Sequence, residues 1–176
     1  NHELTLDSFP ATIDGVAVPV VVDADSASGS MSGLVDGPHL LTLSIADRAG
    51  NVRTTTTAFS TDTGGPQIAV VTPPNGVLLN LRNPELLVTF EDGQGLDLSS
   101  LRIRVNGADR TADFTRTTTE ARATLADALP EGVNTIAVEI SDQASNLGAA
   151  SSSFTLDVTA PSVTVRAPIA NAFLND

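Results

Sequence analysis

Apolar and polar residues alternate along several short segments of the chain, and this alternation predicts β-strands. Residues 135–141, TIAVEIS, alternate strictly, so Ile136, Val138 and Ile140 are expected on one face of a strand. Residues 41–45, LTLSI, alternate in the same way. Two further short runs, rich in β-branched or apolar residues, are predicted strands at 67–71 and 85–91.

The same pattern occurs twice along the chain. Residues 34–52 match residues 129–147 without a gap at an offset of 95 positions, so that DRAGN in the first copy falls on DQASN in the second. Upstream the offset becomes 92, where residues 4–15 match residues 96–107. The sequence therefore contains an internal repeat of roughly 90 residues, about the size of one small domain.

Turn-forming sequences separate the predicted strands, and helical periodicity is weak. PPNG, EDGQG, NGAD and LPEG all carry the Gly, Pro, Asn and Asp residues that turns require. The best helical candidate, residues 120–129, corresponds in the first copy to SASGSMSGL, a poor helix former, so strand and loop are predicted there. Short strands at this spacing predict an all-β protein made of tandem β-sandwiches with Greek-key connections.

The repeats are joined at short linkers that contain proline. DTGGP occupies residues 62–66 and DVTAP occupies residues 157–161. Proline fixes φ and donates no amide hydrogen bond, so Pro66 and Pro161 suit a stiff connection before an edge strand. Gly37 and the equivalent Gly132 stand at the turn before each alternating strand.

Three domain segments follow from these linkers. Residues 1–63 are predicted to be a domain that lacks its first strands, and residues 64–160 a complete domain. Residues 161–176 match residues 66–81 and are predicted to be the first strand of a further domain.

Composition narrows the function classes. The chain has no cysteine, and all 9 basic residues are arginine, so disulfides, thiolate metal sites and lysine chemistry are excluded. With 21 acidic residues the formal net charge is −12, which disfavours nucleic-acid binding. No apolar run approaches the roughly 18 residues of a transmembrane helix, so no membrane insertion is predicted in this segment.

The combined motifs resemble a known family. The linker D-x-x-x-P, the turn P-x-N-G, and the segments GLDLSSLRIRVNG, LPEGVNTIAVEISDQASN and F-x-x-D resemble the immunoglobulin-like domains strung in tandem through large bacterial surface and secreted proteins. The resemblance covers essentially the whole chain. It implies an extracellular or cell-surface location and a role as a stalk or spacer between neighbouring immunoglobulin-like domains. Some relatives bind calcium at domain junctions.

Acidic residues near the linkers are candidate calcium ligands. Residues 90–97, FEDGQGLD, hold three carboxylates around glycines, and each linker adds one aspartate. Calcium takes roughly six to eight oxygen ligands. The alternative is a solvated acidic loop that needs glycine for its turn. The candidates are Asp62, Glu91, Asp92, Asp97 and Asp157.

The DRAGN and DQASN segments also admit two interpretations. Each directly follows an alternating strand, which predicts a turn in which the aspartate caps local amides. Alternatively Asp47 with Asn51, or Asp142 with Asn146, supplies oxygens to calcium. The first interpretation is favoured, because each segment offers only about three oxygen ligands.

The sequence offers few residues or motifs that would support catalysis or sugar binding. The only histidines are His2 and His39, and His39 falls on Asn134 in the repeat, so the repeat does not require an imidazole there. No serine lies in a G-x-S-x-G motif. With neither Trp nor Tyr, the chain lacks the aromatic platforms of sugar-binding sandwiches. No enzymatic activity and no catalytic residue are predicted.

The sequence therefore predicts a non-catalytic structural spacer that displays another module. The alternative is an adhesin or fibre-assembly subunit that binds a protein partner through a sheet edge or through a strand donated by residues 161–176. No cofactor is required, and calcium is possible.

Overall fold

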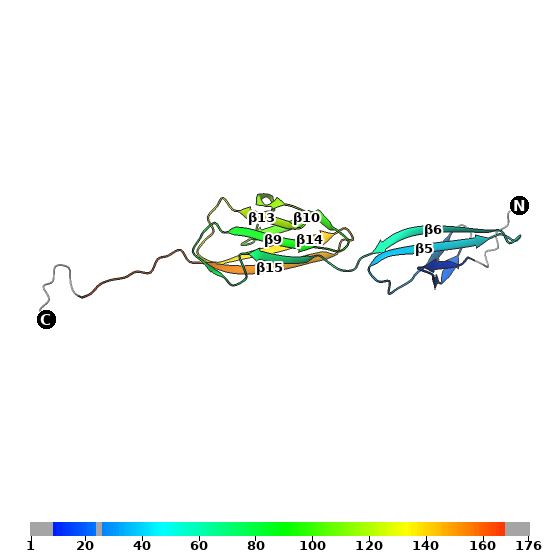
Figure 1. The fold of residues 1–176 in the computed structure, drawn as a ribbon, viewed down its shortest axis with the longest axis horizontal. Helices are drawn as coiled ribbons and strands as arrows, with labels where there is room; N and C mark the ends of the chain where they lie inside the picture. The colour runs from blue at the N-terminus through cyan, green and yellow to red at the C-terminus, as the bar shows by residue number, and fades with distance from the viewer. Residues whose placement is uncertain (1–8, 24–25, 168–176) are drawn as a thin grey trace. The chain divides into compact units, whose positions relative to one another are not determined.

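The computed structural model describes residues 9–23 and 26–167, and these residues form an all-β protein (Figure 1). A single short 3-10 turn, η1 (Thr111–Asp113), interrupts the described strands. Nowhere in this part of the chain is there a helix with the length and hydropathy needed to cross a membrane. His2 and residues 168–176 of the predicted final strand lie outside the described residues, and residues 161–167 form no strand.

Strands β1 to β6 form what we call the first sandwich. One sheet has the order β2-β1-β5-β6, and β3 pairs with β4 in a second, two-stranded sheet. β5 and β6 form a long hairpin, and the two strands lie side by side in Figure 1. The bounds are β1 (Ala11–Ile13), β2 (Val16–Val18), β3 (Val20–Val22), β4 (Ala27–Gly29), β5 (Gly37–Ala46) and β6 (Val52–Thr61).

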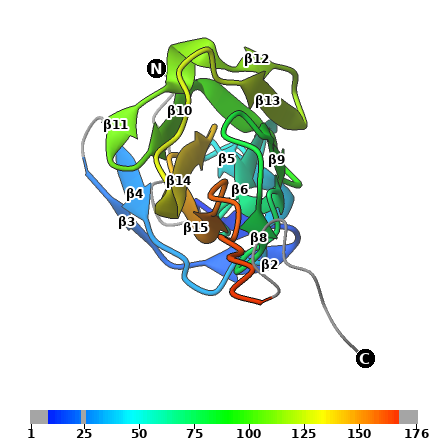
Figure 2. The same ribbon diagram turned by 90° about the vertical axis from the view of Figure 1, so that its left-hand side faces the viewer.

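Strands β7 to β15 form the second sandwich. Its sheets have the orders β11-β10-β14-β15-β8 and β12-β13-β9-β7, and they lie on opposite sides of the core in Figure 2. The bounds are β7 (Gln67–Thr72), β8 (Leu78–Leu79), β9 (Glu85–Glu91), β10 (Leu96–Val105), β11 (Ala108–Asp109), β12 (Thr115–Arg116), β13 (Glu120–Thr124), β14 (Gly132–Asp142) and β15 (Leu147–Leu156).

Alternation along the strands builds the core of the second sandwich. Ile136, Val138 and Ile140 on β14 are at most 1% exposed, as the predicted common face requires. Opposite them, β9 contributes three more buried side chains, Leu86, Val88 and Phe90. The all-β prediction and the strands predicted at 41–45, 67–71, 85–91 and 135–141 are confirmed. Residues 120–129 form strand β13 and a loop, also as predicted.

The internal repeat is visible as a repeat of strands. β1, β2, β5 and β6 have the same order in their sheet as β10, β11, β14 and β15 in theirs. Gly37 and Gly132 begin β5 and β14 with φ of 126° and 94°, values that favour glycine. Glycine therefore occupies both predicted turn positions because the backbone there has a positive φ.

The described residues fall into two compact units. One contains the described residues up to Ile68 together with Phe90–Leu101 and Glu139–Ala149, and the other contains the remaining described residues. The division cuts through β10, β14 and β15, so it does not test the boundaries predicted near residues 63 and 160, which stay predictions.

One strand pair of the second sandwich is parallel. β8 runs beside the end of β15, with Leu78 opposite Thr155 and Leu79 opposite Leu156. Three backbone hydrogen bonds hold the pair: Gly76 N to Ser153 O at 2.7 Å, Thr155 N to Val77 O at 2.9 Å and Asp157 N to Leu79 O at 2.9 Å. This pairing attaches the segment after β7 to the sheet opposite to the one that contains β7.

Candidate functional site

Three aspartates gather where three strands end. Asp62 follows β6, Asp92 follows β9 and Asp142 is the last residue of β14. One carboxylate oxygen from each lies within 4.8 Å of the others, and all three residues belong to the same compact unit. We call this group the aspartate cluster.

Asp142 is fixed by its own turn. Its Oδ1 accepts a hydrogen bond from the Asn146 amide at 2.8 Å, and its Oδ2 accepts one from the Asn146 side chain at 2.8 Å. Burial alone would raise the pKa of Asp142, which is 2% exposed, but the hydrogen bonds from Asn146 and the following amides lower it. Asp142 is therefore a buried carboxylate held in its ionised form.

The equivalent turn in the first sandwich has the same construction. Asp47 Oδ1 accepts from the Asn51 amide at 2.9 Å, and Asp47 Oδ2 accepts from the Asn51 side chain at 2.8 Å. Asp47 N and Asp142 N each donate to the carbonyl oxygen of the respective asparagine, at 3.0 and 3.1 Å. The predicted Asp-to-Asn turn is thus confirmed in both copies.

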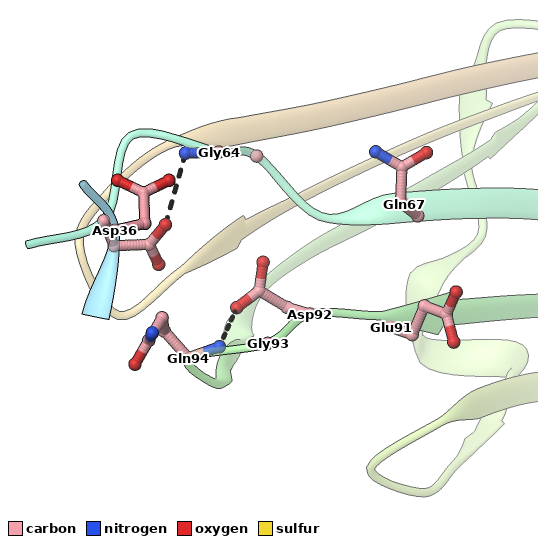
Figure 3. A pocket seen from close by; sticks show the side chains of 9 residues that line it. Asp36, Gly64, Gln67, Glu91, Asp92, Gly93 and Gln94 are labelled. Atoms are coloured by element: carbon pink, nitrogen blue, oxygen red, sulfur yellow. Dashed lines mark hydrogen bonds between the residues drawn. The ribbon is translucent and has the colours of Figure 1, made fainter. Parts of the chain in front are cut away.

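Asp92 is held by the loop that follows β9. Its Oδ1 accepts hydrogen bonds from Gln94 N at 2.8 Å and Gly95 N at 2.9 Å. Figure 3 shows this loop beside a pocket whose lining is mostly glycine and acidic or amide side chains. The lining residues are Asp36, Asp62, Gly64, Gly65, Gln67, Glu91, Asp92, Gly93 and Gln94.

Asp62 is the unusual member of the cluster. Its Oδ1 accepts a long hydrogen bond from Gly64 N at 3.2 Å, whereas its Oδ2 is buried without a hydrogen-bond partner. Burial raises the pKa of Asp62, and the negative charges of Asp142, Asp92 and Asp36 raise it further. A buried, unpartnered carboxylate oxygen among like charges is unfavourable until a proton or a cation reaches it.

Close backbone contact holds the Asp62 segment against β15. The Asn146 side chain donates to the Asp62 carbonyl at 3.0 Å. A Cβ atom on Gly65 would lie 2.8 Å from Leu147 O, and one on Gly148 would collide with Pro66 O. Both positions therefore require glycine, and the linker lies directly on the start of β15.

The donor set fits a hard divalent cation. Three carboxylates offer oxygens of the kind that calcium prefers, and the unpartnered Asp62 Oδ2 is available to a metal without breaking a hydrogen bond. Backbone carbonyls and water would have to supply the remaining ligands of a calcium ion.

The structure places the predicted metal ligands in different surroundings. Asp62 and Asp92 join the aspartate cluster, and Glu91 lines the neighbouring pocket. Asp97 instead accepts hydrogen bonds from Ser99 N and Ser99 Oγ at 2.9 and 2.6 Å, and Asp157 accepts one from Thr159 N at 3.1 Å. Neither of these two belongs to the cluster.

Asp142 was not among the predicted junction ligands. The sequence predicts its turn correctly, but no local pattern connects that turn to Asp62 and Asp92. The available signal was topological: Asp92 and Asp142 each follow a predicted strand, and the strand ends of a sandwich meet at its edges.

His39 is engaged in a polar network in the first sandwich. It is 5% exposed; its Nδ1 lies 2.6 Å from Asp14 Oδ2 and its Nε2 lies 2.8 Å from Val35 O. The hydrogen bond to Asp14, then the one to Val35, raises the pKa of His39, while the hydrogen bond to His39, then the Leu40 amide, lowers the pKa of Asp14. These contacts give the imidazole a structural role.

Comparison with known proteins finds solved structures of low similarity and no family. No family model matches the chain, and no curated protein matches it significantly. The solved structures similar to it include the fibronectin(III)-like modules of Clostridium thermocellum CbhA, at 13% identity and a TM-score of 0.41, covering 89% of this chain and 80% of that one.

Two further similar structures are arrays of such domains. The central fibronectin-III array of RIM-binding protein has 12% identity and a TM-score of 0.31, covering 86% of this chain and 58% of that one. Immunoglobulin domains 1–4 of Sidekick-1 have 12% identity and a TM-score of 0.30, covering 85% and 42%. The all-β, two-sheet architecture that the sequence predicted is shown by the strands and sheets of the chain itself. At these identities and TM-scores no function is carried over.

Proposed function

We propose that this chain is a non-catalytic structural part of a bacterial cell-surface or secreted multidomain protein. Its sandwiches would act as a spacer that holds another module away from the cell, with further immunoglobulin-like domains as its neighbours. The observation that carries this proposal is the reuse of one strand arrangement in both copies of the repeat, joined by a linker packed on the start of β15.

A spacer needs a linker with few accessible conformations. The contacts of this linker support the proposal that it is one. Gly65 and Gly148 allow backbone approach that any side chain would prevent, and Asn146 binds the Asp62 carbonyl. Pro66 is buried at the same place and has a restricted φ. Each of these contacts reduces the number of conformations open to the linker.

We propose in addition that calcium binds at the aspartate cluster. The support is the proximity of three carboxylates together with the buried, unpartnered Oδ2 of Asp62. A bound cation would compensate the mutual repulsion of Asp62, Asp92 and Asp142 and would attach the linker aspartate to two loops of the second sandwich.

The spacer role is tested by single-molecule energy transfer in the full chain. Because the chain has no native cysteine, Ser32→Cys and Thr118→Cys, both at exposed positions, allow specific labelling. We expect one narrow distance distribution, and a broader one after Gly148→Ala, which forces the linker off β15. Gly93→Ala is the matched control, because its Cβ would meet no atom within 4 Å. If the unsubstituted chain itself gave a distance distribution as broad as a flexible linker produces, the spacer role would be wrong.

The calcium proposal has a separate test. Thermal unfolding is followed with calcium and with a chelator, for the unsubstituted chain and for Asp62→Asn. Calcium should raise the midpoint of the unsubstituted chain, and this increase should disappear in Asp62→Asn. In chelator, Asp62→Asn should unfold at a higher temperature than the unsubstituted chain, because one of three like charges is gone. Equal midpoints with and without calcium would refute the calcium proposal and would not affect the proposed spacer role.

Strand addition is the second candidate function, and one observation favours it. Residues 162–167 repeat the pattern of β7, yet Val163 and Val165 are 87% and 73% exposed. Assembly through this segment would give a mass that increases with protein concentration and stays constant when residues 161–176 are removed.

A further inference from the structure

The imidazole of His39 connects three segments of the first sandwich. Its Nδ1 lies 2.6 Å from Asp14 Oδ2, in the turn between β1 and β2. Its Nε2 lies 2.8 Å from Val35 O, in the loop before β5, and 2.9 Å from Thr61 Oγ1 at the end of β6. Thr61 Oγ1 itself donates to Val35 O at 2.7 Å. Because His39 is buried, water does not readily replace these partners.

Only the protonated imidazole satisfies all of these contacts. Asp14 Oδ2 and Val35 O are both acceptors, so each ring nitrogen needs a hydrogen. A neutral ring with its hydrogen on Nδ1 places the lone pair of Nε2 against the Val35 carbonyl. Thr61 can then turn its hydroxyl to Nε2, but Val35 O loses both of its donors. A neutral ring with its hydrogen on Nε2 instead places a lone pair against the Asp14 carboxylate.

Asp14, on the turn between β1 and β2, is the charged group that faces the imidazole. From β6 the ring meets Thr61 and Phe59, and from the loop before β5 it meets the carbonyl of Val35. These three residues carry no charge. The hydrogen bond with Asp14, then the one with Val35, raises the pKa of His39. The proton therefore leaves at a pH above the ordinary value for histidine.

The second sandwich makes the same contact to its loop without a titratable group. Asn134, the equivalent of His39, donates from its Nδ2 to Pro130 O at 2.9 Å. Pro130 is the equivalent of Val35, 95 positions later. A side-chain amide does not titrate in the pH range where histidine does, so this bond keeps its donor. The bond to Val35 O loses its donor when the imidazole loses its proton.

The loop that the imidazole binds also holds the start of the linker. Asp36 follows Val35, and its Oδ1 accepts hydrogen bonds from Thr63 N and Thr63 Oγ1, both at 3.0 Å. The second sandwich repeats this contact, because Glu131 Oε1 accepts from Val158 N at 3.1 Å. A planar peptide joins Val35 to Asp36, so the position of the Val35 carbonyl constrains the residue that binds the linker.

We propose that His39 is a proton-operated switch of the linker. With the proton bound, Val35 O is held and Asp36 is positioned to bind Thr63. Without the proton, the loop before β5 loses this anchor, and the bond between Asp36 and Thr63 opens more often. The inference names a regulation of the linker and rests on the proposed spacer role for its consequence, whereas the switch itself is observed at single amides.

The test is an NMR titration of the isotope-labelled full chain across the pH range in which histidine loses its proton. The imidazole of His39 and the amides of Thr63 and Val158 are followed together. We expect the Thr63 amide resonance to shift with the same midpoint as His39. Its protection from hydrogen exchange, corrected for the intrinsic effect of pH, should fall at least about threefold. The Val158 amide, bonded to Glu131, should not respond.

Two variants at one position trace the connection. Asp36→Ala removes the acceptor, so His39 should still lose its proton while the Thr63 amide no longer follows. Asp36→Glu is the matched control, because the equivalent Glu131 makes the same bond, and it should keep the response.

The proposal is wrong if the Thr63 amide stays unchanged while His39 titrates, or if the Val158 amide responds equally. It is also wrong if Thr63 still follows in Asp36→Ala, or if His39 keeps one protonation state throughout the range. Each of these results leaves the spacer role untouched, because that role is decided by the width of the distance distribution in the unsubstituted chain.

Discussion

Strands β5 and β14 carry the same alternation of apolar and polar residues, but they end in different environments. On β14 the apolar residues are sealed in the core, and on β5 they remain half-buried. The difference does not come from the strands, because their neighbours β6 and β15 are also equivalent. It comes from the opposite sheet, where β9 supplies three large side chains and β3–β4 supplies small ones. Alternation thus specifies which face of a strand is apolar, while the covering sheet determines how much stability that face contributes.

The largest effect is expected from removing the equivalent phenylalanines. Phe154→Ala should lower the free energy of unfolding of the second sandwich by about 3–5 kcal/mol, because it leaves a cavity in a closed core. Phe59→Ala should lower that of the first sandwich by less than half as much, because Phe59 already borders an open groove. Native-state hydrogen exchange on β14 and β5 measures the two losses separately.

Equal losses at the two positions would contradict this comparison. They would mean that the first sandwich is as well packed around Phe59 as the second is around Phe154.

The two sandwiches also differ at one polar pair. In the second, the Asn106 side chain donates to Asn134 Oδ1 at 2.7 Å, and Asn134 is fully buried. In the first, Asp14 and His39 take these positions and form an ion pair at 2.6 Å when the imidazole is protonated. Asp14 and Asn106 share a φ of 51°. Each side chain accepts a 2.8 Å hydrogen bond from a backbone amide of the neighbouring strand in its sheet, Leu40 N on β5 or Thr135 N on β14. The backbone geometry is the same in both sandwiches, but the neutral pair of amides in the second is a pair of titratable side chains in the first.

A pH dependence confined to the first sandwich should follow. The raised pKa of His39 adds stability that is fully present below the pKa of histidine in the unfolded chain and is lost as pH rises through the raised value. The lowered pKa of Asp14 adds stability that is present above the unfolded aspartate value and is lost as pH falls through the lowered one. Protection of β5 should therefore be greatest in weakly acidic solution and decrease towards alkaline pH.

The double variant Asp14→Asn with His39→Asn copies the Asn106–Asn134 pair and provides the control. It should remove the alkaline decrease on β5 and leave β14 unchanged. An alkaline decrease of the same size in this variant would assign the effect to other groups.

The smallest effect is expected at the two Asp-to-Asn turns. Ser145 adopts a φ of 73°, where a side chain is strained, and the equivalent Gly50 adopts 85° without strain. Ser145→Gly should raise the free energy of unfolding of the second sandwich by about 0.5–1 kcal/mol. Chemical denaturation measures the change. Gly50→Ser, the reciprocal substitution, should destabilise the first sandwich, and stabilisation by it would refute the explanation.

Local features were predictable from the sequence. The alternation at 135–141, the glycines at 37 and 132 and the two Asp-to-Asn turns each depend on residues close together in the chain, and the structure confirms them. Non-local features were not. Asp62, Asp92 and Asp142 come together only because β6, β9 and β14 end near one another, and no local pattern records that proximity. The half-burial of Leu41 and Leu43 likewise depends on the opposite sheet.

The parallel pair of β8 and β15 has a mechanical consequence. A tension that pulls the segment before β8 and the segment after β15 in opposite directions would slide these two parallel strands past each other. The three hydrogen bonds between residues 76–79 and 153–157 would then share the load at the same time, instead of opening one after another as in a hairpin peeled from its end. Tension between these two segments would therefore load the pair in shear.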